Sequence, residues 1–168
     1  TPQPTVRRLG PTAGGKTSLA VTLATMLPGG GECISADSMQ VYRGMDIGTD
    51  KPGPELLARA PFALLDLVGH NEGFSAGRWV EAAVASAGAS EDPVLFAGGT
   101  PLYLRLLLRG LFPGPPAHAP TRSAIEELWD EQGEAAVRSE LSTADPESEA
   151  RLLPGDRKRL VRALEVWR

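Results

Sequence analysis

One glycine-rich segment limits the possible folds of this chain more than any other feature. Residues 10–17 read Gly-Pro-Thr-Ala-Gly-Gly-Lys-Thr, which fits the phosphate-loop pattern GxxxxGK[ST] between a strand and a helix. Such a loop aims backbone N–H groups, the positive end of the helix dipole and a lysine at one point, and its last hydroxyl can ligate magnesium. Residues 16–27 have the alanine-rich and leucine-rich spacing of the helix that must follow. The segment therefore predicts a di- or triphosphate site.

The strand expected before this loop is unusual. Residues 5–9 read Thr-Val-Arg-Arg-Leu, and two arginines are poorly suited to a central parallel strand, which is buried on both faces. We expect this strand to be short or to lie at an edge of its sheet.

The remainder of the first 111 residues alternates between short apolar runs and helical patterns. Strands are expected at 33–36, 63–68 and 93–97, and helices at 52–60, 75–89 and 102–108. Strands separated by crossover helices predict an α/β fold, here a phosphate-loop core with a three-layer parallel sheet. A run with four prolines, FPGPPAHAP at 112–120, then indicates a rigid linker.

Beyond the linker the patterns are helical only. Helices are expected at 121–132, 134–142, 146–153 and 157–168. We interpret the chain as an α/β core over 1–111, an all-helical insertion over 112–153 and a basic helix over 154–168 that returns toward the core.

Composition narrows the class of protein. The chain has 168 residues, 42% of them hydrophobic and 23% charged, as in ordinary globular proteins. No apolar run approaches the roughly 18 residues of a membrane span and no leader pattern opens the sequence, so we expect a cytoplasmic protein without membrane contact. Cys33, the single cysteine, excludes an internal disulfide.

Charge is distributed unevenly along the chain. The net charge is −4, but residues 121–150 carry −7 whereas residues 151–168 carry +4. A local basic patch can attract polyanions despite an acidic whole. The alternative is a solvated helix face without a ligand.

Two further motifs follow predicted strands. Asp37 begins a segment reading DSMQVYRGMDIGT, and Gly98-Gly99-Thr100 follows the strand at 93–97. Ligands of open α/β sheets bind where parallel strands end, so Asp37 is a candidate general base, with a helix cap or a metal ligand as alternatives. Asp66 is a second candidate metal ligand. A small-molecule kinase is possible at this stage, although the sequence lacks an arginine-rich lid.

Five segments together resemble a known family. They are GPTAGGKT, ISADSMQVYRGMDIGTDKP, FSAGRW, AGGTPLYLRLLLRGL and RLLPGDRKRLVRALEVWR, in that order. Over nearly the whole chain they resemble the tRNA dimethylallyltransferase (tRNA isopentenyltransferase) family. The resemblance implies transfer of a dimethylallyl group from dimethylallyl diphosphate to N6 of the adenosine 3′ to the anticodon, with release of diphosphate. It also implies Mg2+ as cofactor, the tRNA anticodon stem-loop as partner, and a monomer.

The resemblance assigns roles to individual residues. The donor's diphosphate, or a nucleotide, would be held by Gly10, Pro11, Thr12, Ala13, Gly14, Gly15, Lys16 and Thr17, with Thr17 on the metal. Catalytic roles would belong to Asp37, the general base for adenine N6, and to Lys16 and Thr17. Contacts to tRNA would come from Asp37, Ser38, Met39, Gln40, Thr100, Arg122, Lys158, Arg159, Leu160, Val161 and Arg162.

The sequence also departs from the family pattern. Pro61-Phe62-Ala63 stands where relatives commonly have Pro-His-His, Pro101 follows Thr100, and Lys158 replaces a common glutamine. Relatives continue beyond Arg168 with a long C-terminal region, which we expect to be absent here. The alternatives to a tRNA prenyltransferase are the small-molecule kinase, an adenylate prenyltransferase and a non-catalytic tRNA-binding remnant.

Overall fold

The computed structural model describes residues 5–9, 14–110 and 114–168, with residues 5–9 described as backbone only. The chain forms two compact units, Thr1–Leu111 and Phe112–Arg168. Within the described ranges, no helix has both the length and the apolar character needed to cross a membrane.

The first unit is built on a parallel sheet. Its strands are β1 (Thr5–Leu9), β2 (Glu32–Ser35), β3 (Phe62–Ala63) and β4 (Val94–Gly98), in the spatial order β1-β4-β2-β3. The edge position predicted for the arginine-containing strand is confirmed, because β1 pairs only with β4 among the described residues. Leu9 pairs with Gly98 and Ser35 pairs with Ala97. The carboxyl ends of β1, β2 and β4 therefore lie at the same edge of the sheet.

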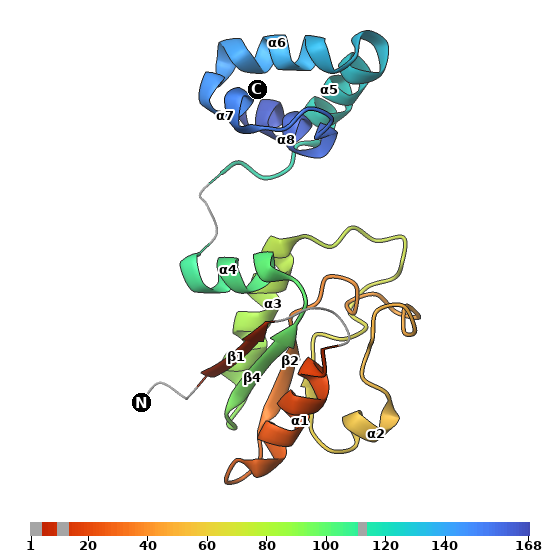
Figure 1. Cartoon of the computed structure of the whole chain (residues 1–168), viewed down its shortest axis with the longest axis vertical. Coiled ribbons are helices and arrows are strands. Elements are labelled where there is room, and N and C mark those ends of the chain that lie inside the picture. Colours follow the sequence, from red (N-terminus) through yellow and green to blue (C-terminus); the bar gives the residue numbers. More distant parts are fainter. Residues whose placement is uncertain (1–4, 10–13, 111–113) are drawn as a thin grey trace. The chain divides into compact units, whose positions relative to one another are not determined.

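Helices cover both faces of this sheet, so the predicted three layers are confirmed (Figure 1). On one face, Leu95 and Ala97 of β4 pack against α1 (Lys16–Met26) through Ala20, Val21 and Ala24. On the other face, the alternate β4 residues Val94 and Phe96 share a core with α3 (Ala76–Ala89) and α4 (Pro101–Arg109). Both faces of β4 are thus buried, which explains its uninterrupted apolar sequence. A short helix, α2 (Pro54–Leu57), precedes β3.

The prediction of a strand over residues 63–68 is wrong. Only Phe62–Ala63 pair with β2, because Leu64 and Asp66 adopt left-handed backbone angles, with φ of 63° and 56°, that end the ladder. The chain then runs beside residues 40–43 instead. The Val68 N–H donates to the Val41 carbonyl at 3.1 Å, and the Arg43 N–H donates to the Val68 carbonyl at 2.9 Å.

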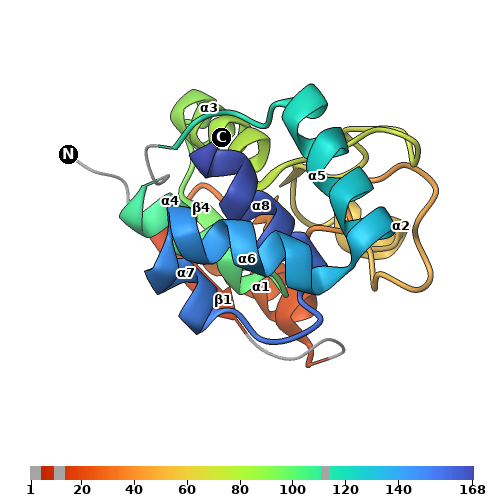
Figure 2. The same cartoon turned by 90° about the horizontal axis from the view of Figure 1, so that it is seen from above.

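The second unit consists of helices α5 (Ala119–Gln132), α6 (Glu134–Ala144), α7 (Pro146–Arg151) and α8 (Arg157–Trp167). These confirm the four expected helices with small changes of boundary. In both views α5, α6 and α8 lie side by side (Figures 1 and 2). They enclose one core, made of Ile125, Val137, Leu141, Leu160, Val161 and Leu164. The segments 112–153 and 154–168 therefore contribute to the same unit.

Trp79 links α3 to the sheet in the first unit. Its side chain is fully buried, its ring stacks on Tyr103 with centroids 4.6 Å apart, and its Nε1–H donates to the Ser35 carbonyl at 2.9 Å.

We expect Trp79→Phe to lower the free energy of unfolding by about 1–3 kcal/mol, because the buried carbonyl loses its partner. Trp167→Phe, the same change at a side chain exposed by 58%, should leave it within about 0.5 kcal/mol. Urea denaturation of both variants measures this, and equal losses would contradict the role of Trp79.

Candidate functional site

The start of α1 and the loops after β2 and β4 meet around one pocket. It is lined by Lys16, Thr17, Asp37, Gln40, Thr49, Asp50, Ala97, Gly98 and Gly99. The fold thus brings Lys16, Thr17 and Asp37 together with the Gly98-Gly99 turn, as the sequence motifs predict. Gly10, Pro11, Thr12 and Ala13 of the predicted phosphate loop lie outside the described residues.

This pocket is narrow. Its volume is about 10 Å³, enough for about one water molecule.

The described part of the phosphate loop has the geometry that the motif requires. Gly15 adopts a left-handed backbone, with φ of 67°, directly before α1. The start of a helix directs N–H groups and the positive end of the helix dipole toward an anion. Lys16 is the first residue of α1 and is 9% exposed.

Asp37 lies two residues after the end of β2 and faces the glycine turn after β4. Its Oδ1 accepts a hydrogen bond from the Met39 N–H at 2.9 Å, so one oxygen supports the local turn, as the helix-cap alternative anticipates. Its Oδ2 has no hydrogen bond among the described residues. A Cβ on Gly99 would lie 3.1 Å from Oδ2. The missing side chain at position 99 therefore leaves room for the carboxylate.

Gly98 allows the loops after β2 and β4 to touch. A Cβ there would lie 2.1 Å from the carbonyl oxygen of Ala36, far inside van der Waals contact. Beyond this point the Thr100 N–H donates to the same carbonyl at 3.1 Å, and the Ser38 N–H donates to the Thr100 hydroxyl at 2.9 Å. Ser38 and Thr100, both predicted tRNA contacts, thus fix each other beside Asp37.

Gln40 is committed to the fold in this structure. The side chain is 7% exposed, and its Nε2 donates to the carbonyls of Thr49 and Asp50, both at 3.0 Å. Its Oε1 accepts from the Ser35 hydroxyl at 2.8 Å. The resemblance implies that Gln40 contacts a base. While these hydrogen bonds last, the Gln40 side chain can offer a base only the second lone pair of Oε1. Met39, by contrast, is 42% exposed.

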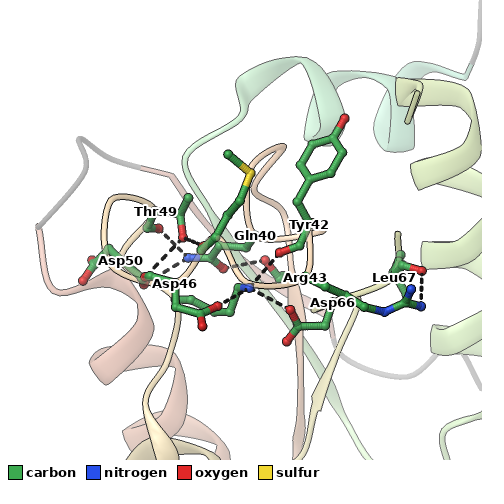
Figure 3. A network of polar contacts seen from close by, with 11 residues as sticks. Gln40, Tyr42, Arg43, Asp46, Thr49, Asp50, Asp66 and Leu67 are labelled. Atoms are coloured by element: carbon green, nitrogen blue, oxygen red, sulfur yellow. Dashed lines mark hydrogen bonds and ion pairs between the residues drawn. The ribbon is translucent and has the colours of Figure 1, made fainter. Parts of the chain in front are cut away.

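A network that sequence reasoning missed holds the loop after Gln40 (Figure 3). Lys51 Nζ donates to Asp46 Oδ1 at 2.6 Å, to Asp66 Oδ1 at 2.7 Å and to the Tyr42 carbonyl at 2.9 Å. Burial of Lys51 lowers the pKa of its ammonium group, but the hydrogen bonds to Asp46 and Asp66 outweigh burial and raise that pKa above its ordinary value. The signal in the sequence was the lysine ending the DIGTDK run. Asp66, a candidate metal ligand by sequence, instead pairs with this lysine.

The described residues contain no cluster of three or more His, Cys, Asp or Glu side chains arranged to hold a metal ion. The residues with side-chain oxygens around the pocket are Thr17, Asp37, Gln40, Thr49 and Asp50. A metal ion here would need oxygens from a ligand as well.

The helical unit carries a second candidate site, which we call the basic groove. It has a volume of about 410 Å³ and is lined by Arg122, Glu126, Arg157, Lys158, Val161 and Arg162. The structure thus brings Arg122, from α5, together with Lys158 and Arg162, from α8. Arg157, which the sequence analysis did not single out, also lines the groove, where it pairs with Asp130 at 2.7 Å.

Other residues of the predicted 158–162 contact stretch are placed differently. Leu160 and Val161 are buried in the helical core, at 0% and 4% exposure, so their side chains stabilise the unit. Arg159 is exposed and pairs with Asp156 at 2.7 Å. A contact to tRNA from this stretch therefore depends on Lys158, Arg159 and Arg162.

A buried carboxylate contacts two arginines of the basic groove. The Glu165 side chain is 1% exposed, and its Oε2 lies 2.6 Å from Arg122 Nη2 and 2.9 Å from Arg162 Nη1. Burial raises the pKa of Glu165, but the ion pair with Arg162 and the hydrogen bonds from Arg122 and from the His118 N–H outweigh burial and lower that pKa to about 2. Glu165 is therefore ionised at neutral pH.

Comparison with known proteins identifies relatives of the chain. The IPP transferase family model matches residues 40–168. A tRNA dimethylallyltransferase of Geobacter sulfurreducens is 48% identical over 94% of this chain and 51% of its own length. One from Thioalkalivibrio sulfidiphilus is 48% identical over 98% of this chain and 52% of its own length. The chain thus spans about half the length of the curated relatives it matches.

Solved structures give the same picture. The chain is similar to a tRNA isopentenylpyrophosphate transferase of Bacillus halodurans, with a TM-score of 0.61, 36% identity, and coverage of 98% of this chain and 55% of the other. The corresponding Staphylococcus epidermidis protein has a TM-score of 0.56 and 31% identity, over 97% and 54% of the two chains. A eukaryotic dimethylallyltransferase acting on tRNA, 24% identical, shares the fold with a TM-score of 0.72 over 97% and 41% of the two chains.

Gly98 offers a test of the contact between the loops. We expect Gly98→Ala to lower the free energy of unfolding by more than about 2 kcal/mol, because the Ala36 carbonyl must move to admit the methyl group. Gly88→Ala on α3 is the matched control, since a Cβ there meets nothing within 4 Å and alanine favours a helix by about 1 kcal/mol. Chemical denaturation of both variants measures the difference. A stable Gly98→Ala variant would show that the loops do not depend on this approach.

Proposed function

The chain belongs to the IPP transferase family, and from this premise we propose that it is a tRNA dimethylallyltransferase. The proposed reaction moves a dimethylallyl group from dimethylallyl diphosphate to N6 of the adenosine 3′ to the anticodon, and it releases diphosphate. One observation carries the proposal: Lys16 and Thr17 of a phosphate-loop motif line the same pocket as Asp37, the first residue of the DSMQ segment. A phosphate group and an activated nucleophile would meet there.

The phosphate loop would serve the leaving group. Cleavage of the bond between carbon and oxygen builds negative charge on the diphosphate. N–H groups at the start of α1 and the Lys16 ammonium group stabilise that charge most as it develops, which lowers the barrier. We propose the whole motif, Gly10–Thr17, as the donor site.

Magnesium fits this proposal. Mg2+ is commonly held by one or two protein oxygens together with substrate phosphates and water, and the Thr17 hydroxyl lines the pocket. When bound, the ion would supply charge stabilisation to the departing diphosphate.

Asp37 would act on the acceptor. An adenine must leave the stack of the anticodon loop to reach an enclosed site, and its exocyclic amine must lose a proton as the new bond to carbon forms. The Asp37 Oδ2 atom makes no hydrogen bond in the described part of the chain, so it is available to accept that proton. Ser38, Met39, Gln40 and Thr100 are the proposed neighbours of the base.

The basic groove would bind the tRNA backbone. Arg122, Lys158 and Arg162 line it, and Arg159 lies on the same helix. Cations of this kind bind phosphates and set the register of the RNA without reading its sequence. We propose that the helical unit, residues 112–168, binds tRNA and that the enzyme acts as a monomer.

Three alternatives predict different outcomes. A small-molecule kinase would convert ATP to ADP, an adenylate prenyltransferase would modify AMP, and a tRNA-binding remnant would bind tRNA without modifying it. The test is transfer of label from dimethylallyl diphosphate, with magnesium, to unmodified tRNA, beside AMP and ATP controls. Label in tRNA supports the proposal. Label in AMP indicates an adenylate prenyltransferase, ADP indicates a kinase, and bound but unlabelled tRNA indicates the remnant.

Two substitutions separate the proposed roles. Asp37→Asn should lower the rate of transfer by at least about 100-fold, because general-base catalysis typically contributes that much, while donor affinity stays nearly unchanged. Lys16→Ala should weaken donor binding and transfer together. Calorimetric titration with dimethylallyl diphosphate and single-turnover transfer measure the two effects. A loss of donor affinity in Asp37→Asn would instead assign Asp37 to the metal or to the fold.

The groove predicts a change in salt dependence. Lys158→Ala should weaken binding of an anticodon stem-loop RNA and reduce the magnitude of the slope of log K against log salt by about 0.7–1, the change expected for one lost phosphate contact. Arg151→Ala is the matched control, an exposed cation of the same unit that does not line the groove. Equal slopes for the two variants would mean that the groove does not contact phosphate.

A further inference from the structure

We propose that Glu165 is the positioning residue of the basic groove: its buried carboxylate holds Arg122 and Arg162 in place for an RNA phosphate. The inference rests on the proposed function for its ligand. It concerns a residue with no phosphate contact of its own, since a carboxylate repels phosphate.

The contacts of Glu165 join separate parts of the helical unit. Its Oε2 forms ion pairs with Arg122 Nη2 of α5 at 2.6 Å and with Arg162 Nη1 of α8 at 2.9 Å. Its Oε1 accepts from the His118 N–H at 2.7 Å, at the start of α5. Arg162 in turn donates through Nη2 to the Pro115 carbonyl at 2.7 Å. One carboxylate therefore fixes two guanidinium groups and the segment that leads into α5.

The arrangement leaves donors for a ligand. Arg122 uses only Nη2 on Glu165, and its Nε and Nη1 hydrogens have no partner in the described part of the chain. Arg157 is different, because both of its terminal nitrogens contact Asp130. Arg122 is thus a half-exposed arginine that is already ordered, and a ligand need not supply the cost of ordering it.

Simple electrostatics and positioning predict opposite results. Removing a negative charge beside an anion site should strengthen anion binding if only net charge matters. If Glu165 positions the arginines, its removal should weaken binding, because Arg122 and Arg162 would repel each other and lose their fixed geometry. Ordering one long side chain costs a factor of about 2–10 in affinity, so two arginines give a loss of about tenfold.

The test compares Glu165→Gln with Glu126→Gln in the 168-residue chain. Both remove one negative charge, and Glu126 is an exposed residue that lines the groove. The probe is an unmodified anticodon stem-loop RNA, followed by fluorescence anisotropy at fixed salt, with circular dichroism to verify that both variants are folded. We expect binding about tenfold weaker for Glu165→Gln, and tighter for Glu126→Gln, which removes a negative charge from the lining of the groove. Unchanged or tighter binding by folded Glu165→Gln overturns the inference.

A double variant separates positioning from a general structural role. In the Arg122→Ala background, Glu165→Gln should cost no more than about threefold, because one of the two arginines that it positions is gone. An undiminished tenfold loss there overturns the inference. If Glu165→Gln does not fold, Arg122→Lys replaces it: the charge remains but the planar fork is lost. Weaker binding by Arg122→Lys then supports positioning, and equal binding overturns it.

Failure of the proposed function has its own signature. If the unsubstituted chain binds no stem-loop RNA, or if Lys158→Ala binds like the unsubstituted chain, the groove is not the RNA site and both proposals are overturned. If Lys158→Ala is weakened but Glu165→Gln is not, only the positioning role fails.

Discussion

The candidate site depends on one close approach, that of Gly98 to the carbonyl of Ala36. No residue with a Cβ fits there, since that atom would lie 2.1 Å from the carbonyl oxygen. The approach lets the Thr100 N–H donate to the Ala36 carbonyl and the Ser38 N–H donate to the Thr100 hydroxyl. These two hydrogen bonds join the loops and place Asp37 beside the glycine turn. Because the strands are parallel and in register, the start of α1 reaches the same edge. The position of Asp37 follows from this contact, whereas Lys16 and Thr17 are positioned by α1.

The two units solve different physical problems. The α/β unit brings the Asp37 carboxylate near the proposed phosphate site, and it does so at the ends of parallel strands. The helical unit must keep several cations close together. There a buried carboxylate, Glu165, offsets the repulsion between two arginines and fixes them. The first unit thus relies on backbone geometry and the second on a buried charge.

The sequence predicted the parts of the fold that have strong local signals. The alternation of apolar runs and helical patterns gave three layers, and the paired arginines at positions 7 and 8 indicated an edge strand. It failed at 63–68, because the left-handed backbone of Leu64 and Asp66 has no glycine to mark it. The apolar residues Leu64 and Val68 are buried as a strand would bury them, so composition could not reveal the turn.

The site was predictable to a similar degree. The motifs named Lys16, Thr17 and Asp37, and the fold brings them together. Lys51 and Glu165 escaped notice because their roles depend on partners far away in the sequence, such as Asp66 for Lys51 and Arg122 for Glu165. Leu160 and Val161 belong to a motif that the resemblance linked to tRNA, yet they serve the helical core. A motif names a segment, whereas burial decides which of its side chains can meet a ligand.

The central claim is that the phosphate loop and Asp37 serve a single reaction. It is tested most directly by a crystal structure of the chain with magnesium and an unreactive thio analogue of dimethylallyl diphosphate. The account predicts the diphosphate at the N–H groups of the start of α1, with the first prenyl carbon about 6 Å from the Asp37 carboxylate, the distance spanned by an attacking amine between them. A diphosphate bound elsewhere, or a prenyl chain directed away from Asp37, would contradict it.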